Sequence, residues 1–366
     1  MTTPASSSTT YLLAGGGTAG HVNPLLAVAD GLRARDAAAS VLVLGTREGL
    51  EARLVPERGY ELLIVDKVPF PRRPNLAALR FPLAWHRAVG QVRRHIRDRR
   101  VDVVAGFGGY ASAPAYVAAR REGVPYVVHE ANARPGLANI LGARRAAGVG
   151  VALPDTPLRG AETVGMPLRA EIVDLDRAST RDDAARFFGL DPARPVLLVF
   201  GGSLGARRLN ETFADAWPAV VDAGWQLLHA AGERDPIVDP GHPDYRIVAY
   251  LDRMDLALAV ADLVVSRSGA ATVSEVSALG IPAVYVPYAV GNGEQALNAR
   301  GAVAAGAAQL IEDAAFTPDR VREQIVPLLH DATALSAMRA AAQARTAAAR
   351  TGTASVMAML DRALAR

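Results

Sequence analysis

The sequence contains no cysteine, which excludes disulfide bonds, thiolate metal ligands and a cysteine nucleophile. It also has no apolar run near the roughly 18–20 residues that a membrane-spanning helix needs. Aromatic residues make up only 5% of the chain. The 40 Lys and Arg residues against 37 Asp and Glu residues leave a net charge of +3, so the overall electrostatic field is weak. Residues 1–10 have no basic segment followed by an apolar one, so we expect a disordered tail and not a signal peptide.

The rest of the composition is typical of an α/β protein. With 366 residues, 50% of them hydrophobic, and 33 glycines, the chain is long enough for two domains with separate cores. Short apolar runs alternate with longer helical patterns, which predicts parallel sheets wrapped by helices. The predicted strands are residues 11–14, 41–44, 62–65, 101–105 and 126–129 in the first half, and 196–200, 226–230, 246–250, 263–265, 283–286 and 308–311 in the second.

The alternation breaks between residues 166 and 195, where no strand is evident, and we expect the domain junction there. The sequence therefore predicts an N-terminal Rossmann-like domain over residues 11–168 and a C-terminal one over residues 169–349. A helix over about residues 350–366 is expected to pack back onto the first domain.

The segment from Ser266 to Glu275 follows the apolar run 263–265 and is expected to lead from a strand end into a helix. Thr272 and Ser274 are predicted to cap that helix. Free N–H groups and the positive end of the helix dipole favour an anion there, and Glu275, about one turn into the helix, suits the hydroxyls of a ribose diol. A phosphate position beside a diol acceptor suggests a nucleotide. The alternative is an ordinary capped helix whose Glu275 is solvated.

A glycine-rich turn follows the first predicted strand. Gly15, Gly17 and Gly20 satisfy the G-x-G-x-x-G pattern of dinucleotide-binding folds. Such a fold also needs an acidic residue at the end of the second strand, whereas residues 44–47 read Leu-Gly-Thr-Arg. An NADP-dependent oxidoreductase therefore remains as a weakened alternative. In either case the turn is a good cradle for an anion.

His21 follows this turn at the expected binding edge of the sheet. An imidazole suits general-base catalysis at neutral pH, and the neighbouring anion position favours this role over a helix-start histidine bonded to the backbone. His129 lies at a strand end, where a structural hydrogen bond is favoured. The remaining histidines show no metal-ligand spacing and are expected at the surface or in packing: His86, His95, His229, His242 and His330.

Two amides follow the turn at residues 291–293. Gln295 and Asn298 are three residues apart, so they share one face of a helix. Neutral amides suit sugar hydroxyls, which both donate and accept hydrogen bonds. The alternative is a polar helix start with no ligand.

Residues 71–87 form a basic stretch that also carries apolar and aromatic side chains. The residues that suit the interface of an anionic membrane are Arg72, Arg73, Leu76, Leu79, Arg80 and Trp85. The alternative is a core-packing helix with a solvated basic face. Nucleic acid is disfavoured because aromatics are few and no RNA- or DNA-binding motif is present.

Together these segments resemble the MurG family, the peripheral-membrane N-acetylglucosaminyltransferases of peptidoglycan synthesis. The resemblance runs over nearly the whole chain after the tail. The segments that carry it are residues 16–21 (GGTAGH), 108–110 (GGY), 129–132 (HEAN), 165–169 (GMPLR), 201–206 (GGSLGA), 266–275 and 295–298.

The resemblance implies the GT-B fold, an α/β fold of two Rossmann-like domains whose parallel sheets face one another across a cleft. It implies that residues 11–168 bind acceptor and membrane and residues 169–349 bind the UDP-sugar. The implied reaction is an inverting transfer of GlcNAc from UDP-GlcNAc to the muramyl 4-hydroxyl of lipid I, forming lipid II, with no cofactor and no metal. The implied partners are UDP-GlcNAc, the lipid-linked muramyl-peptide acceptor, an anionic membrane surface and other cell-wall synthesis proteins, at the cytoplasmic face of the membrane.

The resemblance also implies roles for individual residues. His21 is expected to be the catalytic base, and Gly16, Gly17 and Tyr110 to address the diphosphate of the acceptor. The residues expected to bind UDP-GlcNAc are Thr18, Ala19, Gly20, Asn132, Arg169, Ser203, Leu251, Ala270, Ala271, Thr272, Glu275, Gln295 and Asn298.

The chain departs from the family pattern at three positions. Ala19, Ala131 and Glu294 stand where the family usually has Gly, Gln and Gln. These departures concern the sugar end of the donor more than its uridine. A nucleotide-sugar isomerase on the same fold, such as a UDP-GlcNAc 2-epimerase, is the alternative to transfer.

Overall fold

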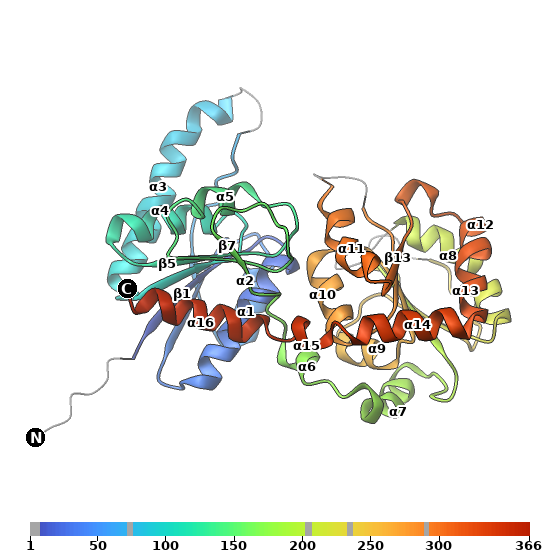
Figure 1. The fold of residues 1–366 in the computed structure, drawn as a ribbon. Helices are drawn as coiled ribbons and strands as arrows, with labels where there is room; N and C mark the ends of the chain where they lie inside the picture. Colours follow the sequence, from blue (N-terminus) through green and yellow to red (C-terminus); the bar gives the residue numbers. More distant parts are fainter. Residues whose placement is uncertain (1–7, 72–75, 202–206, 233–236, 289–292) are drawn as a thin grey trace, which may run out of the picture. The chain divides into compact units, whose positions relative to one another are not determined.

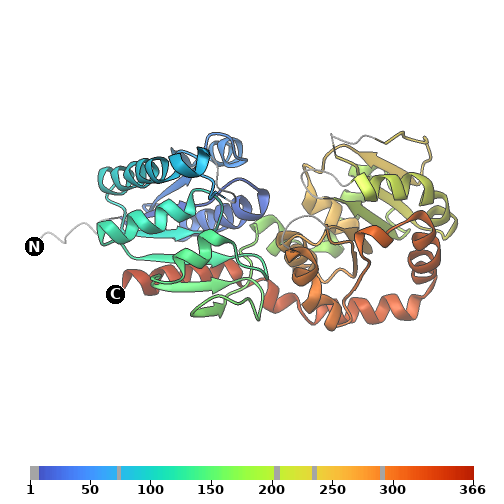
Figure 2. The same ribbon diagram turned by 90° about the horizontal axis from the view of Figure 1, so that it is seen from above.

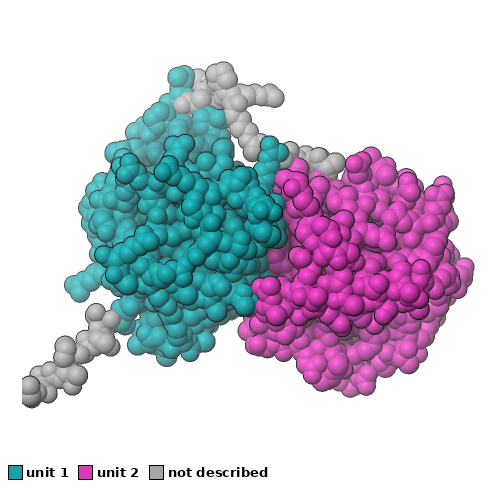
Figure 3. All heavy atoms as spheres, viewed as in Figure 1, with its two compact units in different colours: residues 1–169, 351–366 teal, residues 170–350 magenta. Residues whose placement is uncertain are grey.

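The computed structural model describes residues 8–71, 76–201, 207–232, 237–288 and 293–366. Its contacts divide the chain into two compact units, residues 1–169 with 351–366 (unit 1) and residues 170–350 (unit 2), coloured separately in Figure 3. Each unit contains one parallel sheet with its own hydrophobic core.

Unit 1 is built on a seven-stranded parallel sheet with the strand order β3-β2-β1-β4-β5-β6-β7. The strands are β1 (Thr10–Ala14), β2 (Ser40–Gly45), β3 (Glu61–Ile64), β4 (Val103–Gly106), β5 (Tyr126–Glu130), β6 (Gly148–Val151) and β7 (Ala161–Thr163). The chain order reverses between β1 and β4. At such a reversal the loops after the two strands part to opposite faces, which leaves a binding position at the carboxyl edge of the sheet.

Helices cover both faces of this sheet (Figures 1 and 2). They are α1 (Ala19–Arg35), α2 (Glu51–Glu57), α3 (Leu76–Asp98), α4 (Ser112–Glu122), α5 (Leu137–Gly142) and α16 (Gly352–Leu364). Helix α16 comes from the end of the chain and packs beside α1. Glycines make room for its methionines, since a Cβ at Gly148 would lie 2.6 Å from Met359 Cγ and one at Gly31 would lie 2.8 Å from Met357 Sδ.

Unit 2 repeats the plan with a six-stranded parallel sheet in the order β10-β9-β8-β11-β12-β13. The strands are β8 (Val196–Phe200), β9 (Gln226–Ala230), β10 (Tyr245–Val248), β11 (Leu263–Ser266), β12 (Ala283–Tyr285) and β13 (Ala308–Leu310). The larger helices are α7 (Arg177–Phe188), α8 (Arg207–Asp222), α9 (Met254–Val260), α10 (Ala270–Ala278), α11 (Glu294–Ala304) and α14 (Ala332–Gln343). Here the reversal falls between β8 and β11, so the binding position lies beside the start of α10.

The predicted α/β fold with parallel sheets is confirmed, and every predicted strand is present within three residues of its expected bounds. Strands β6 and β7 were missed because β6 reads Gly-Val-Gly-Val and β7 has only three residues, so neither forms an apolar run. Helix α1 was predicted from about Asn23 but begins at Ala19, since the Thr18 carbonyl already accepts the N–H groups of His21 and Val22. Residues 166–195, which contain no strand, hold α7 and the short helix α6 (Ala170–Val173).

Candidate active site

Two glycine loops of unit 1 touch one another at the carboxyl edge of its sheet. A Cβ at Gly109, whose φ is +80°, would lie 2.3 Å from the Gly16 carbonyl oxygen, so the loop after β4 rests directly on the loop after β1. The Ser112 hydroxyl lies 2.8 Å from the Ala14 carbonyl oxygen and accepts the Gly108 N–H at 3.0 Å. The two loops therefore form one continuous backbone surface.

His21, in the first turn of α1, lies on that surface and is half-buried. Its Nδ1 is 3.1 Å from the Gly16 carbonyl oxygen and 3.3 Å from the Thr18 hydroxyl. A carbonyl oxygen only accepts, so Nδ1 carries the proton and Nε2 keeps its lone pair. The structure thus contains the backbone-bonded histidine given above as the alternative, and this same geometry leaves Nε2 able to accept a proton.

Glu51 is a buried acid behind the first glycine loop, and it is not among the residues predicted from the sequence. Its side chain has no exposed surface, and its Oε2 accepts the Gly17 N–H at 2.8 Å. Its Oε1 accepts the N–H and the hydroxyl of Thr46 at 2.9 and 2.8 Å. Its signal in the sequence was the pair of nearby glycines, Gly45 and Gly49. Both leave room for the Glu51 side chain, since a Cβ at Gly49 would lie 2.0 Å from the carboxylate.

Glu130 organises the loop at the end of β5 that contains Asn132. The Glu130 side chain is 2% exposed, and its carboxylate accepts the N–H groups of Asn132 and Gly136, each at 2.9 Å. It also accepts the Asn139 amide at 2.9 Å. These bonds fix the backbone of Asn132, one of the residues expected to bind UDP-GlcNAc, in the loop that follows β5.

The remaining predicted residues of unit 1 differ in their surroundings. His129 is buried with Nε2 3.0 Å from the Gly165 carbonyl oxygen, and burial lowers its pKa below the ordinary value, so its predicted structural role is confirmed. Tyr110 is 41% exposed, and the Lys67 ammonium lies 5.0 Å from its ring centroid. Arg169, the last residue of the first segment of unit 1, is half-buried.

In unit 2 the loop after β11 leads directly into α10. Gly269 is the N-cap residue and the helix begins at Ala270, so the prediction that Thr272 and Ser274 cap it was wrong: both lie inside the helix. The Ser268 hydroxyl is buried and has no hydrogen-bond partner among the described residues. Glu275 follows on α10 and is 9% exposed, so it is not the solvated first-turn residue of the alternative interpretation.

The two predicted amides of unit 2 both bind backbone. The Asn298 amide donates to the Ser268 carbonyl oxygen at 3.2 Å, which ties α11 to the loop before α10. Gln295 Oε1 accepts the Tyr288 N–H at 2.9 Å. Leu251, which follows β10 at the edge of the sheet, is buried, and no described contact links it to this cluster.

A neighbouring arginine was overlooked. Arg267 is 7% exposed and donates to the Val286 carbonyl oxygen at 3.0 Å and to Asp313 at 2.5 Å. It joins the end of β11 to the end of β12, so it fixes the loop from which α10 starts. A charged residue directly after an apolar strand was its signal in the sequence.

Part of the predicted membrane stretch and one predicted donor residue lie outside the described residues: Arg72, Arg73, the side chain of Leu76, and Ser203. On the described part of α3, Leu79 is 78% exposed and Arg80 is exposed. Trp85 is half-buried, with its ring 5.5 Å from Phe70. No helix in the described ranges is both long and apolar enough to cross a membrane. The described residues contain no cluster of three or more metal-ligating side chains.

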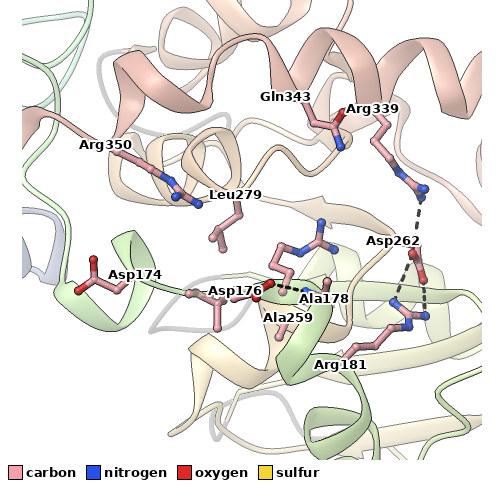
Figure 4. A pocket seen from close by; sticks show the side chains of 12 residues that line it. Asp174, Asp176, Ala178, Arg181, Ala259, Asp262, Leu279, Arg339, Gln343 and Arg350 are labelled. Atoms are coloured by element: carbon pink, nitrogen blue, oxygen red, sulfur yellow. Dashed lines mark hydrogen bonds and ion pairs between the residues drawn. The ribbon is translucent and has the colours of Figure 1, made fainter.

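Unit 2 also has a pocket of about 580 Å³ lined by arginines and acids (Figure 4). Asp262, which directly precedes β11, accepts from Arg181 at 2.9 Å, so this pocket is at the amino edge of the sheet, opposite to Ser268. Arg177 donates to the Leu258 carbonyl oxygen, and burial lowers its pKa to about 10. Arg177 and Arg181 donate hydrogen bonds to carbonyl oxygens at the end of α9, so stabilisation of this helix end accounts for their positions. The pocket is separate from the candidate active site.

Comparisons with known proteins agree with this geometry. The model of the glycosyltransferase family 28 N-terminal domain matches residues 11–151, and that of the family 28 C-terminal domain matches residues 196–352. The crystal structure of Acinetobacter baumannii MurG matches with a TM-score of 0.76 at 27% identity, covering 97% of this chain and 99% of that one. A putative UDP-N-acetylglucosamine 2-epimerase from Listeria monocytogenes has a TM-score of 0.64 at 15% identity over 93% and 94% of the chains, a likeness of fold alone. The two parallel α/β units and these matches define a glycosyltransferase of the GT-B class.

The similar proteins identify the family within this class. A protein of Clavibacter sepedonicus is 63% identical over 335 residues, 91% of each chain, and one of Leifsonia xyli subsp. xyli is 58% identical over 352 residues, 96% of this chain and 98% of that one. Both are named UDP-N-acetylglucosamine--N-acetylmuramyl-(pentapeptide) pyrophosphoryl-undecaprenol N-acetylglucosamine transferase. The chain belongs to this family, the MurG N-acetylglucosaminyltransferases, and the resemblance stated from the sequence is confirmed.

Proposed function

We propose that the protein transfers GlcNAc from UDP-GlcNAc to the 4-hydroxyl of the muramyl sugar of lipid I, giving lipid II and UDP. The observation that carries this proposal is the 63% identity to a transferase so named, over 91% of both chains. The donor and the undecaprenyl-linked acceptor are those that the names of the relatives state.

The donor's nucleotide is assigned to unit 2. The buried Ser268 hydroxyl supports this assignment, because within the described part of the chain it has no partner, and a diphosphate oxygen would accept from it. The positive end of the α10 dipole stabilises charge that develops on the leaving diphosphate. Glu275, buried on the same helix, takes the ribose diol. The further residues proposed for this site in unit 2 are Ser203, Leu251, Ala270, Ala271, Thr272, Gln295 and Asn298.

Unit 1 is assigned the acceptor and the proton transfer. We propose that the His21 Nε2 lone pair takes the proton of the muramyl hydroxyl as its oxygen bonds to C1 of GlcNAc. The bond from C1 to the diphosphate oxygen breaks, and its electron pair leaves with UDP, so one displacement inverts the configuration. Further contacts to UDP-GlcNAc are proposed for Thr18, Ala19, Gly20, Asn132 and Arg169, and contacts to the acceptor diphosphate for Gly16, Gly17 and Tyr110.

Attachment to the cytoplasmic face of the membrane is proposed for the exposed side of α3. Leu79 and Leu83 are 78% and 67% exposed, and their spacing of four residues places them on one helical face. Arg80 and Arg87 are exposed on the same helix, where they suit an anionic lipid surface. A lipid-linked acceptor requires such a surface. We also propose that the protein contacts other cell-wall synthesis proteins.

The test is release of UDP from UDP-GlcNAc with and without a lipid I analogue. We expect release only with the acceptor. A new epimer formed from UDP-GlcNAc alone would favour the isomerase, and NADPH binding seen by fluorescence would favour the oxidoreductase. His21→Ala should lower turnover by about 10²–10⁴-fold, the range for a general base, while sparing UDP affinity. The matched control is His330→Ala, since His330 is an exposed histidine of unit 2.

A further inference from the structure

The carboxylate of Glu51 joins three segments of unit 1. Glu51 is the first residue of α2, and it binds Thr46 at the end of β2 and Gly17 in the loop after β1. Its side chain has no exposed surface and takes part in no ion pair with a described residue. Three donated hydrogen bonds therefore hold a buried negative charge directly behind the catalytic edge of the sheet.

Three glycines surround this carboxylate. A Cβ at Gly16, Gly45 or Gly49 would lie 2.2, 2.4 or 2.0 Å from the nearest side-chain atom of Glu51. Any side chain at these positions would occupy the space that the acid fills. The glycines at positions 16, 45 and 49 are thus explained by a protein side chain, without a ligand.

One peptide group connects Glu51 to His21. The N–H of Gly17, which donates to Glu51 at 2.8 Å, and the carbonyl of Gly16, which lies 3.1 Å from His21 Nδ1, belong to the same peptide unit. A hydrogen bond from the N–H to a carboxylate polarises the peptide and makes its carbonyl oxygen a stronger acceptor. That carbonyl fixes the Nδ1–H tautomer and stabilises the imidazolium that forms when Nε2 takes a proton.

We infer that Glu51 is a positioning residue for His21, acting through the Gly16–Gly17 peptide as a carboxylate acts directly on the histidine of a Ser-His-Asp triad. The inference rests on the proposed role of His21 as the base. Glu51 itself touches no substrate, because it is enclosed by protein. Other charged and titratable groups at this edge of unit 1 include Lys67 and Tyr110 beside the loop after β4, and His129 and Glu130 at the end of β5. Arg47 and Glu48 follow β2, and Arg134 follows β5; all three are exposed.

Glu51→Gln tests the inference because it keeps the shape of the side chain and removes its charge. With ¹⁵N-labelled histidine, and the His21 signals assigned by their loss in His21→Gln, we expect the wild type to hold the proton of the neutral ring on Nδ1. In Glu51→Gln the Nε2–H tautomer should become populated. We expect kcat to fall about tenfold and KM for UDP-GlcNAc to stay unchanged.

Two control variants separate charge from packing. Thr46→Val removes a donor to Oε1 but leaves the charge, so it should lower stability without changing the His21 tautomer. Glu122→Gln removes a carboxylate of unit 1 that pairs with Arg93 and Arg97 at the end of α4, and it should leave the His21 tautomer, kcat and KM unchanged.

An unchanged tautomer of His21 in folded Glu51→Gln would overturn the inference. If that variant does not fold, the wild type alone decides, because an Nε2–H neutral ring would overturn the inference equally. Altered NMR signals with unchanged turnover would uphold the positioning of His21 and refute its role as base, so the two failures are distinguishable.

Discussion

Acid is expected to destabilise unit 2 through His229, a histidine in its core. Its side chain has no exposed surface, and its Nδ1 and Nε2 lie 2.9 Å from the Tyr245 hydroxyl and 3.1 Å from Asn210 Oδ1. An amide oxygen only accepts, so Nε2 carries the proton and Nδ1 accepts from the tyrosine hydroxyl. The neutral ring is therefore fully bonded, and burial lowers the pKa of His229 from 6.5 to about 4.

The size and sign of the effect follow from this pKa. A fall from 6.5 to about 4 corresponds to about 3 kcal/mol of unfolding free energy, at about 1.4 kcal/mol per pH unit. The histidine binds a proton more readily in the unfolded chain, so the unfolded state gains protons first as the pH drops. The stabilisation by neutral His229 is thus complete above pH 6.5 and is lost progressively between pH 6.5 and about 4.

Urea denaturation of the wild type and of His229→Gln across this pH range measures the effect. Fluorescence reports unit 2 through Trp217 and Trp225, and the Trp217 ring stacks 5.6 Å from Tyr245. The gap in unfolding free energy between the two proteins should shrink by about 3 kcal/mol from pH 7 to pH 4. For the exposed His330→Gln the gap should stay constant. A constant gap for His229→Gln as well would refute the reasoning.

Three further predictions concern the site and the proposed membrane surface. Gly109→Ala should destabilise unit 1 by about 2–4 kcal/mol in thermal melts, because the residue has a left-handed backbone and the new Cβ would clash with the Gly16 carbonyl oxygen. Gly160 also has a left-handed backbone but open space around its Cβ, so Gly160→Ala should cost only about 1–2 kcal/mol. Glu275→Ala should weaken UDP binding in calorimetry about tenfold or more, and unchanged affinity would remove the ribose assignment. Replacing both Leu79 and Leu83 by Ser should reduce binding to anionic vesicles in sedimentation while leaving turnover with a short-chain acceptor unchanged; undiminished binding would contradict the membrane role of α3.

The sequence predicted the sheets well because buried parallel strands are continuous apolar runs, such as Val196–Phe200. It placed the glycine turns correctly at the carboxyl ends of parallel strands, because these turns directly follow such runs. The sequence did not predict which polar side chains form hydrogen bonds within the protein and which are left to bind a ligand. The backbone bond of Asn298 and the buried positions of Arg267 and Glu51 depend on contacts between segments far apart in the chain, which local spacing does not reveal. Gln295 bonds to the backbone of Tyr288, seven residues earlier.

The contacts of Glu51 also argue against a dinucleotide site at the G-x-G-x-x-G pattern of Gly15, Gly17 and Gly20. In a dinucleotide site the loop after β1 binds a pyrophosphate and an acid near the end of β2 holds the ribose. Here the acid that follows β2 is enclosed, with its oxygens bonded to Thr46 and to the Gly17 N–H. A pyrophosphate on the inner side of this loop would meet a buried negative charge and would have to displace it.

The oxidoreductase alternative is disfavoured on these grounds. An acceptor diphosphate, proposed above to contact Gly16 and Gly17, would instead lie on the outer side of this loop, near the positive end of the α1 dipole. That position is on the same side of the loop as His21, so one face of the glycine turn would carry both the acceptor's charge and the base, while Glu51 supports the other face.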